Sequence, residues 1–239
     1  MRLDKFLSVT GTLTRSESKK AIRAGRLRID GAVAKSGETQ LDPEMQKVSL
    51  DGKEIIYRRF TYIMLNKPEG YVSATDDKKD KTVLDLLPDE MKKDGLFPCG
   101  RLDKYTIGLM LITDDGDIGH KLLAPKSHVT KSYRFEAEHE VSEADAEALR
   151  TGVHIEGGYL TKPCGLTLDE GRSSGVITLR EGKYHQIKQM LEATKNKITY
   201  LERITFGSLG LDASLARGEW RYLTEEEIKA LRADVNNNL

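Results

Sequence analysis

The hydrophobic pattern of the first 25 residues predicts two short helices. Leu3, Phe6 and Leu7 recur at the spacing of one helix face. Charged and apolar residues follow the same spacing over residues 16–24, and Gly25 comes next as a helix stop. The chain is therefore predicted to open with a helical pair.

Short strands with tight turns are predicted after these helices. Residues 26–31 and 48–52 each contain an Asp-Gly pair, which favours hairpin turns, and residues 54–57 return as another strand. Arg58-Arg59 then forms the predicted linker. The pattern indicates a small module followed by a larger domain, with boundaries at residues 1–58 and 59–239.

From residue 61 onward, strand and helix patterns mix without strict alternation. The run 109–112 is apolar throughout and bounded by turn signals, as expected for a strand buried on both faces. Helix starts are predicted at Ser142 and Thr224, whose side chains can cap a helix. Further strands are predicted at 62–65, 132–137, 164–168, 175–180 and 198–206, and further helices at 117–123 and 184–193. This order favours an α+β domain built on a mixed, largely antiparallel sheet with flanking helices.

The composition argues against several classes of protein. Charged residues make up 32% and hydrophobic residues 38% of the 239 positions, and no apolar run reaches the roughly eighteen residues of a membrane span. No signal-peptide pattern follows Met1, so we expect a cytoplasmic monomer without membrane contact. Cys99 and Cys164 form no Cys-x-x-Cys pair, and the five histidines show no metal-ligand spacing. We therefore expect neither a metal nor a cofactor.

The net charge of zero hides an uneven distribution. Residues 1–35 carry nine basic and three acidic residues, so the rest of the chain is correspondingly acidic. Arg15, Lys19 and Arg23 stand four residues apart and share one face of the second predicted helix. Such a stripe can contact several phosphates at once, and Ser16 at the helix start adds backbone donors. A solvated surface helix would show the same pattern, so charge alone leaves both interpretations open.

The order of motifs in this module resembles a known RNA-binding module. The segments Arg-Leu-Asp-Lys-Phe-Leu, Thr-Arg-Ser-Glu-Ser-Lys-Lys-Ala-Ile-Arg-Ala-Gly and Ile-Asp-Gly are similar to the alpha-L module shared by a primary small-subunit ribosomal protein and tyrosyl-tRNA synthetase. The resemblance covers about residues 1–50 and implies RNA binding. The RNA contacts expected in the module are Arg2, Lys5, Arg15, Ser16, Lys19, Lys20, Arg23 and Arg26.

Residues 100–116 place a carboxylate, Asp103, in a loop that leads into a buried strand. The segment reads Gly-Arg-Leu-Asp-Lys-Tyr-Thr-Ile-Gly, then an apolar run, then Thr-Asp-Asp-Gly. A carboxylate held between glycines beside a buried strand is positioned and partly dehydrated, as a nucleophile or base requires. A turn aspartate that accepts a backbone amide bond fits the same residues. The residues alone leave both interpretations open.

Four motifs in register resemble the RsuA-type branch of the rRNA pseudouridine synthases. The segment around Asp103 is similar to the active-site motif of that family. Residues 65–70 resemble its first motif, which packs beside the active site, and residues 131–133 resemble the motif whose Tyr stacks on the target base. Residues 181–190 resemble the last motif, whose basic residue pairs with the catalytic Asp. Together with the N-terminal module, the resemblance spans nearly the whole chain.

The resemblance implies that the chain isomerises uridine to pseudouridine without a cofactor. The target base must first leave its stack, because the sugar–base bond is otherwise out of reach. The family pattern makes Asp103 the nucleophile, Lys188 its ion-pair partner and Tyr133 the stacking residue with a phenol for proton transfer. It also makes Arg101 the residue that enters the RNA where the base has left, and we expect Lys67 to contact RNA. The sequence does not distinguish an attack of Asp103 on the sugar from an attack on the base ring.

The remaining candidates fit structural roles. Cys99, between a proline and a glycine, fits a packing residue. His185 could be a general base, but in the predicted helix it fits a backbone hydrogen bond better. Asp114 and Asp115 could be a carboxylate pair, but beside Gly116 they fit a turn and a helix start.

The expected substrate is rRNA, either free or in a partly assembled ribosomal subunit. Small-subunit (16S) rRNA is favoured because large-subunit enzymes with this module often carry a long basic tail, whereas this sequence stops at Leu239. A large-subunit (23S) rRNA enzyme, a non-catalytic ribosome-assembly factor and a nucleoside hydrolase remain alternatives. The presence of Asp103, Tyr133 and Lys188 together favours an enzyme over the assembly factor.

Overall fold

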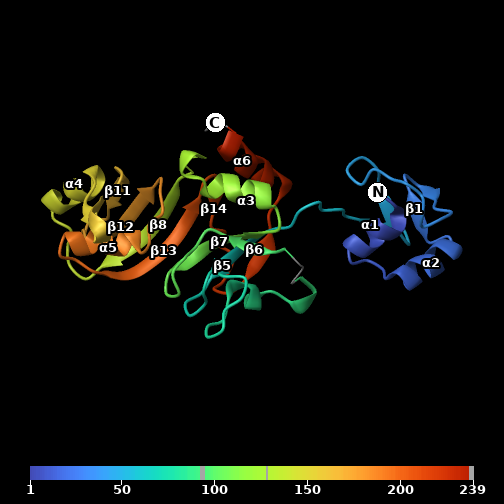
Figure 1. Ribbon diagram of the computed structural model, residues 1–239, viewed down its shortest axis with the longest axis horizontal. Coiled ribbons are helices and arrows are strands. Elements are labelled where there is room, and N and C mark those ends of the chain that lie inside the picture. The colour runs from blue at the N-terminus through green and yellow to red at the C-terminus, as the bar shows by residue number, and fades with distance from the viewer. Residues whose placement is uncertain (92–94, 128, 237–239) are drawn as a thin grey trace. The chain divides into compact units, whose positions relative to one another are not determined.

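A computed structural model describes residues 1–91, 95–127 and 129–236. The chain divides into two compact units, Met1–Arg59 and Phe60–Leu239 (Figure 1). Each unit has buried hydrophobic residues of its own. The boundary predicted after residue 58 lies one residue earlier. Within the described residues, no helix is both long enough and apolar enough to cross a membrane.

The N-terminal unit packs two helices on a small antiparallel sheet. The helices are α1 (Leu3–Val9) and α2 (Arg15–Arg23), and the sheet has the order β2-β1-β3-β4. Its strands are β1 (Leu27–Ile29), β2 (Ala32–Val33), β3 (Val48–Leu50) and β4 (Lys53–Ile55). Helix α2 begins one residue before the predicted start, because a capping box formed by Thr14 and Glu17 satisfies its first backbone amides. Leu3, Phe6, Leu7 and Leu27 form the centre of this core.

The C-terminal unit is built on a nine-stranded mixed sheet with the main order β11-β12-β8-β13-β7-β5-β15. Strands β6 and β14 pair with β7 and β13, respectively. The strands are β5 (Tyr62–Lys67), β6 (Phe97–Cys99), β7 (Ile107–Thr113), β8 (Lys131–Ala137), β11 (Gly165–Leu168), β12 (Ser174–Leu179), β13 (Ile198–Phe206), β14 (Leu209–Gly210) and β15 (Trp220–Tyr222). A separate small hairpin joins β9 (His154–Ile155) and β10 (Tyr159–Leu160). The predicted α+β class with a largely antiparallel sheet is confirmed.

In the part of this unit that the structure describes, helices cover the sheet in two groups (Figure 1). Helices α3 (Gly116–Leu123) and α6 (Glu225–Asn236) contribute to the core on one face of β5 and β7. Helices α4 (Glu143–Thr151) and α5 (Gln186–Ala193) pack with β8, β11 and β12 at the other end of the sheet. Short 3-10 turns are η1 (Val83–Leu86), η2 (Asp89–Met91), η3 (Pro125–Ser127) and η4 (Glu156–Gly158).

Strand β7 is buried on both faces, as its apolar run predicts. Leu109 and Leu111 face the core under α3 and α6, whereas Met110 and Ile112 face a second core that contains Val83 of η1. Within the described sheet, β7 and β13 form the one parallel pair, which joins its two halves. We call this parallel pairing the seam.

Gly108 permits the close approach of the two strands at the seam. A Cβ atom at this position would lie 2.4 Å from the backbone oxygen of Arg203 on β13, and the φ of Gly108 is +97°. A side chain is excluded both by the neighbouring backbone and by this positive φ. Gly108 therefore lets β13 pack directly against β7.

Candidate active site

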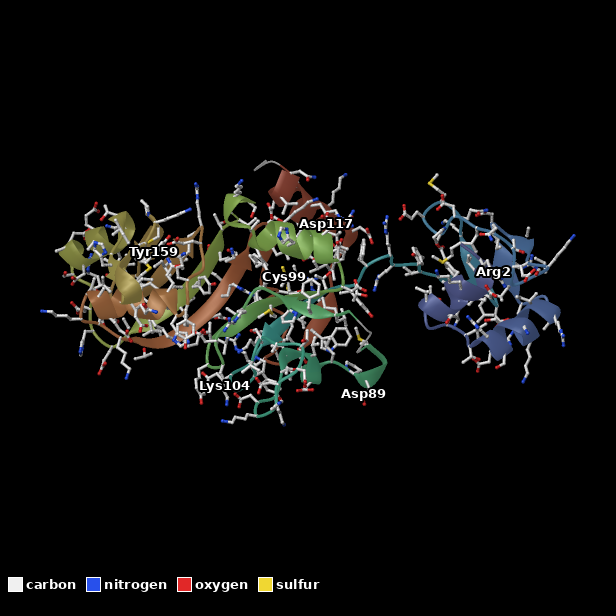
Figure 2. The ribbon with its side chains drawn as sticks, viewed as in Figure 1. Arg2, Asp89, Cys99, Lys104, Asp117 and Tyr159 are labelled. Carbon is white, nitrogen blue, oxygen red and sulfur yellow. The ribbon has the colours of Figure 1, made fainter. Side chains whose placement is uncertain are left out.

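The loop between β6 and β7 carries Asp103 and is fixed by backbone-directed hydrogen bonds. Ser73 accepts a bond from the Leu102 amide through its Oγ and donates one to the Leu102 carbonyl, both at 2.9 Å. The Thr106 amide donates to the Asp103 carbonyl at 3.1 Å. Lys104 of the same loop, labelled in Figure 2, pairs with Asp80 at 2.6 Å. The backbone at Asp103 is therefore held in place from several sides.

Lys67, at the end of β5, is the central clamp of this loop. Its Nζ donates to the carbonyls of Asp103 (3.1 Å), Lys104 (3.2 Å) and Thr106 (2.7 Å), and also to that of Pro68 (3.2 Å). The residue is 0% exposed, and burial lowers the pKa of its ammonium to about 8. The prediction that Lys67 contacts RNA is wrong, because its ammonium is enclosed by backbone oxygens beneath the loop.

Replacing Lys67 by Met should weaken both the fold and the site. The change leaves buried carbonyls without a donor, which costs about 1–3 kcal/mol of unfolding free energy. It also releases the backbone of Asp103, so we expect turnover to fall by roughly tenfold or more even where the protein is fully folded. Urea unfolding and turnover assays measure the two effects. Lys104→Met is the matched control from the same loop, and equal losses in both variants would contradict the clamp.

The carboxylate of Asp103 lies between two basic side chains from the start of α5. Lys188 Nζ is 3.0 Å from Asp103 Oδ2, and His185 Nε2 is 3.3 Å from Oδ1. The three side chains are 28%, 30% and 36% exposed for Asp103, Lys188 and His185, respectively, so none is fully buried. The ion pair expected between Lys188 and Asp103 is present in the structure. Contacts to both carboxylate oxygens hold the group in one direction, which suits a nucleophile.

The contact with His185 was not predicted. Helix α5 begins at Gln186, two residues after the predicted start, and His185 stands just before it with a φ of +48°. This left-handed conformation turns the imidazole away from the helix and toward the carboxylate, so the prediction of a helical His185 bonded to backbone is wrong. The motif spacing contained no signal for this, because the turn depends on the backbone of one residue.

A cavity of about 400 Å³ opens beside this carboxylate. Its lining includes Arg101, Asp103, Tyr133, His185 and Lys188, so the four residues predicted to be catalytic lie around one space. Tyr133 is half-buried on β8 and packs against two of the cores, whereas Arg101 is exposed. The volume falls in the range of small-ligand sites, about 300–1,000 Å³.

Two further cations line the inner wall of the cavity. Arg203 of β13 is 1% exposed, and its Nε donates to the Leu109 carbonyl at 2.7 Å. Lys131 of β8 donates to the Val129 carbonyl at 3.0 Å, and burial lowers the pKa of its ammonium to about 8. Both lie over the ring of Phe206. These cations give the cavity a positively charged wall, suited to an anionic ligand.

The other candidates have structural roles. Asp115 caps α3, since its Oδ1 accepts the Ile118 amide at 3.2 Å, and Asp114 accepts the Thr61 amide at 2.6 Å. Cys99 is buried against α3 (Figure 2), and burial raises the pKa of its thiol to about 11. In the described ranges, no group of three or more His, Cys, Asp or Glu residues could hold a metal ion.

The basic residues of the N-terminal unit fall into two sets. Most of the predicted RNA contacts are exposed and form no salt bridge with a described residue, namely Lys5, Arg15, Lys19, Lys20 and Arg23. Ser16 is also exposed, but the side chain that caps α2 belongs to Thr14. Arg2 pairs with Asp4 and Arg26 pairs with Asp51. These two arginines would have to exchange a carboxylate for a phosphate in order to bind RNA.

Known proteins similar to this chain cover it almost completely. A family model described as RNA pseudouridylate synthase matches residues 61–193, and one described as S4 domain matches residues 1–47. The chain is 47% identical, over 97% of its length and 98% of the relative's, to YtzG of Bacillus subtilis (strain 168), an uncharacterised RNA pseudouridine synthase. It is 40% identical to ribosomal small subunit pseudouridine synthase A of Escherichia coli (strain K12), over 97% and 100% of the two chains. A crystal structure of a pseudouridylate synthase aligns with a TM-score of 0.68 and 36% identity, over 97% of this chain and 99% of that one.

Proposed function

The chain belongs to the RNA pseudouridine synthase family, in its RsuA-type branch and with an S4 domain at its N-terminus, and we propose that it isomerises one uridine of small-subunit rRNA with Asp103 as the nucleophile. The observation that carries the assignment of Asp103 is its carboxylate, held between Lys188 and His185 at the edge of the cavity. Small-subunit rRNA is supported by the 40% identical Escherichia coli relative, a pseudouridine synthase of the ribosomal small subunit.

The reaction needs a nucleophile and space for rotation, with no outside atom. The bond between N1 and C1′ breaks, the uracil rotates, and C5 bonds to C1′; C5 loses a proton and N1 gains one. Asp103 attacks as a carboxylate that Lys188 holds in direction, and its bond to the substrate breaks again when C5 bonds to C1′, so the carboxylate is regenerated. Tyr133 offers an aromatic face for the unstacked uracil and a hydroxyl for moving the proton. Arg101 enters the RNA where the base has left its stack.

Mapping pseudouridines tests this function. Small-subunit and large-subunit rRNA are compared between cells with and without the protein, and the purified protein is then incubated with the unmodified rRNA. We expect one small-subunit uridine to lose its modification in the deletion strain and to regain it in vitro. A missing modification in large-subunit rRNA would move the substrate to the other subunit. Unchanged maps, with no product in vitro, would contradict the function itself.

The exposed stripe of α2 gives a prediction for RNA binding. Changing Arg15, Lys19 and Arg23 together to Ala should weaken binding to rRNA. The dependence of log affinity on log salt should flatten by about 0.7–0.9 for each phosphate that the variant no longer neutralises, because each neutralised phosphate releases condensed counterions. Filter binding across a salt series measures the slope. Arg28→Ala supplies a control from β1 of the same unit, and an unchanged slope in the triple variant would mean that the stripe faces solvent.

A further inference from the structure

One aromatic side chain at the cavity stands largely in solvent. Tyr184, in the turn before α5, lines the cavity and is 66% exposed. Apolar rings of this size usually bury more of their area on folding, and an exposed one beside a binding cavity is available to a ligand. The mechanism proposed above assigns no task to this residue.

The ring of Tyr184 is nevertheless packed on one face, and the backbone that carries it is anchored. One of its faces stacks on the imidazole of His185, with centroids 3.8 Å apart and planes inclined by 21°. Its backbone carbonyl accepts a 2.7 Å bond from the Gln189 side chain of α5. The preceding amide, that of Lys183, donates to Gln186 at 2.9 Å, and Gln186 in turn donates to Glu181 at 2.7 Å. A ring fixed in this way loses little conformational entropy when a ligand stacks on it.

The surroundings of Tyr184 favour a nucleic-acid base as that ligand. The ring's other face is free of any described aromatic partner, and the cavity beside it is lined by Arg101, Lys131, Lys188 and Arg203. Aromatic rings beside cations are the common means of binding unpaired nucleotides, because the bases stack while the cations contact phosphates. The imidazole of His185, which stacks on Tyr184, contacts the Asp103 carboxylate at 3.3 Å. One imidazole therefore lies between the Tyr184 ring and that carboxylate.

We propose that the open face of Tyr184 stacks on an unpaired base next to the target uridine. The Tyr184–His185 pair is then a stacking platform that fixes the RNA strand beside Asp103. When the uridine turns into the cavity, its neighbour loses a stacking partner, and the platform replaces it. This inference rests on the proposed function, since it requires an RNA strand with an unstacked uridine at the cavity.

A double-mutant cycle between protein and RNA tests the platform. The probes are short rRNA fragments centred on the uridine that the wild-type protein is found to modify. Each fragment carries either its normal bases or a single abasic residue on the 5′ or the 3′ side of that uridine. kcat/KM is measured for wild type, Tyr184→Ala and Tyr184→Leu. Tyr184→Phe keeps the ring, and Tyr105→Ala removes another tyrosine that is also 66% exposed but does not line the cavity.

We expect the abasic residue on one side to lower the wild-type kcat/KM by about 5- to 150-fold, the range of one stacked base. Tyr184→Ala and Tyr184→Leu should lose a similar factor on intact RNA, mainly through KM, and should lose little more on the abasic RNA. Tyr184→Phe and Tyr105→Ala should respond to the abasic residue as wild type does. The platform would be overturned if the abasic residue lowered kcat/KM by the same factor in Tyr184→Ala as in wild type. It would also be overturned if the Ala and Leu variants kept the wild-type kcat/KM on intact RNA.

The test separates the two proposals. The cycle uses whichever uridine the wild-type protein modifies, so a large-subunit target would overturn the proposed substrate and leave the cycle valid. A wild-type protein that forms pseudouridine normally, with no coupling between Tyr184 and either neighbouring base, would overturn the platform alone. Loss of the fold in the Ala variant would show in its circular dichroism spectrum, and the Leu and Phe variants would then decide.

Discussion

Asp103→Asn should abolish pseudouridine formation while leaving affinity for RNA within a few-fold of wild type. Asn keeps the size and hydrogen-bonding reach of Asp but carries no negative charge, so it cannot attack the sugar or the ring. The loop should keep its shape, because Lys67 and Ser73 bind the backbone of this segment rather than the carboxylate. Isomerisation on rRNA, measured together with binding, distinguishes a chemical defect from a binding defect.

The control for Asp103→Asn is the same substitution at a carboxylate that pairs with a side chain of this loop but does not line the cavity. Asp80 pairs with Lys104 and does not line the cavity, so Asp80→Asn should keep most of the turnover. Residual turnover of Asp103→Asn above a few per cent of wild type would contradict its assignment as the nucleophile.

Lys188→Met should lower turnover by at least about a hundredfold, the scale of losing one positioned catalytic group. The ammonium lies 3.0 Å from the Asp103 carboxylate, and both side chains are about two-thirds covered. Removing its charge leaves a partly desolvated carboxylate without this partner, which loosens the direction in which the carboxylate points. Lys188→Arg should recover much of the turnover because the charge returns. Turnover of the Met and Arg variants, measured on the same rRNA as wild type, checks the prediction.

His185 provides a second variant that tests the contacts of the Asp103 carboxylate. It is the second basic group at the carboxylate, so it can support part of the Asp103 charge in the Met variant when protonated. Adding His185→Gln to Lys188→Met should therefore lower turnover further. If Lys188→Met works like wild type and the double variant does not, His185 is the important partner. If both work like wild type, Arg101 is the next residue to test.

The sequence predicted those parts of the fold and site that depend on short, local patterns. The apolar run of β7, the capping residues Ser142 and Thr224 and the strand-rich order of the C-terminal unit are confirmed, because each reflects burial or capping within a few residues. The family is confirmed as well, since its motifs keep their order along the chain. The individual roles of Asp103, Tyr133, Arg101 and Lys188 remain predictions, to which the structure adds that all four line one cavity.

What the sequence could not predict depends on tertiary contacts. A lysine in a strand is usually exposed, and the burial of Lys67 follows from carbonyls that a distant loop directs at it. The contact of His185 with Asp103 follows from one left-handed residue before α5. Arg203 is buried because β13 joins β7 at the seam, and a nine-residue strand gives no sign of that pairing.

The seam also governs when the protein can become active during refolding. Its register pairs Ile107 with Glu202 and Gly108 with Arg203, so the chain must close a very long loop before these strands meet. Contacts of such sequence separation form slowly, because the entropy of loop closure is lost before any contact energy is gained. Asp103 precedes β7, while Lys188 and His185 come from the half of the sheet beyond the seam. In a refolding time course, the helical circular dichroism signal should therefore return before isomerase activity. The return of activity should report the slow, final pairing of the two halves of the sheet.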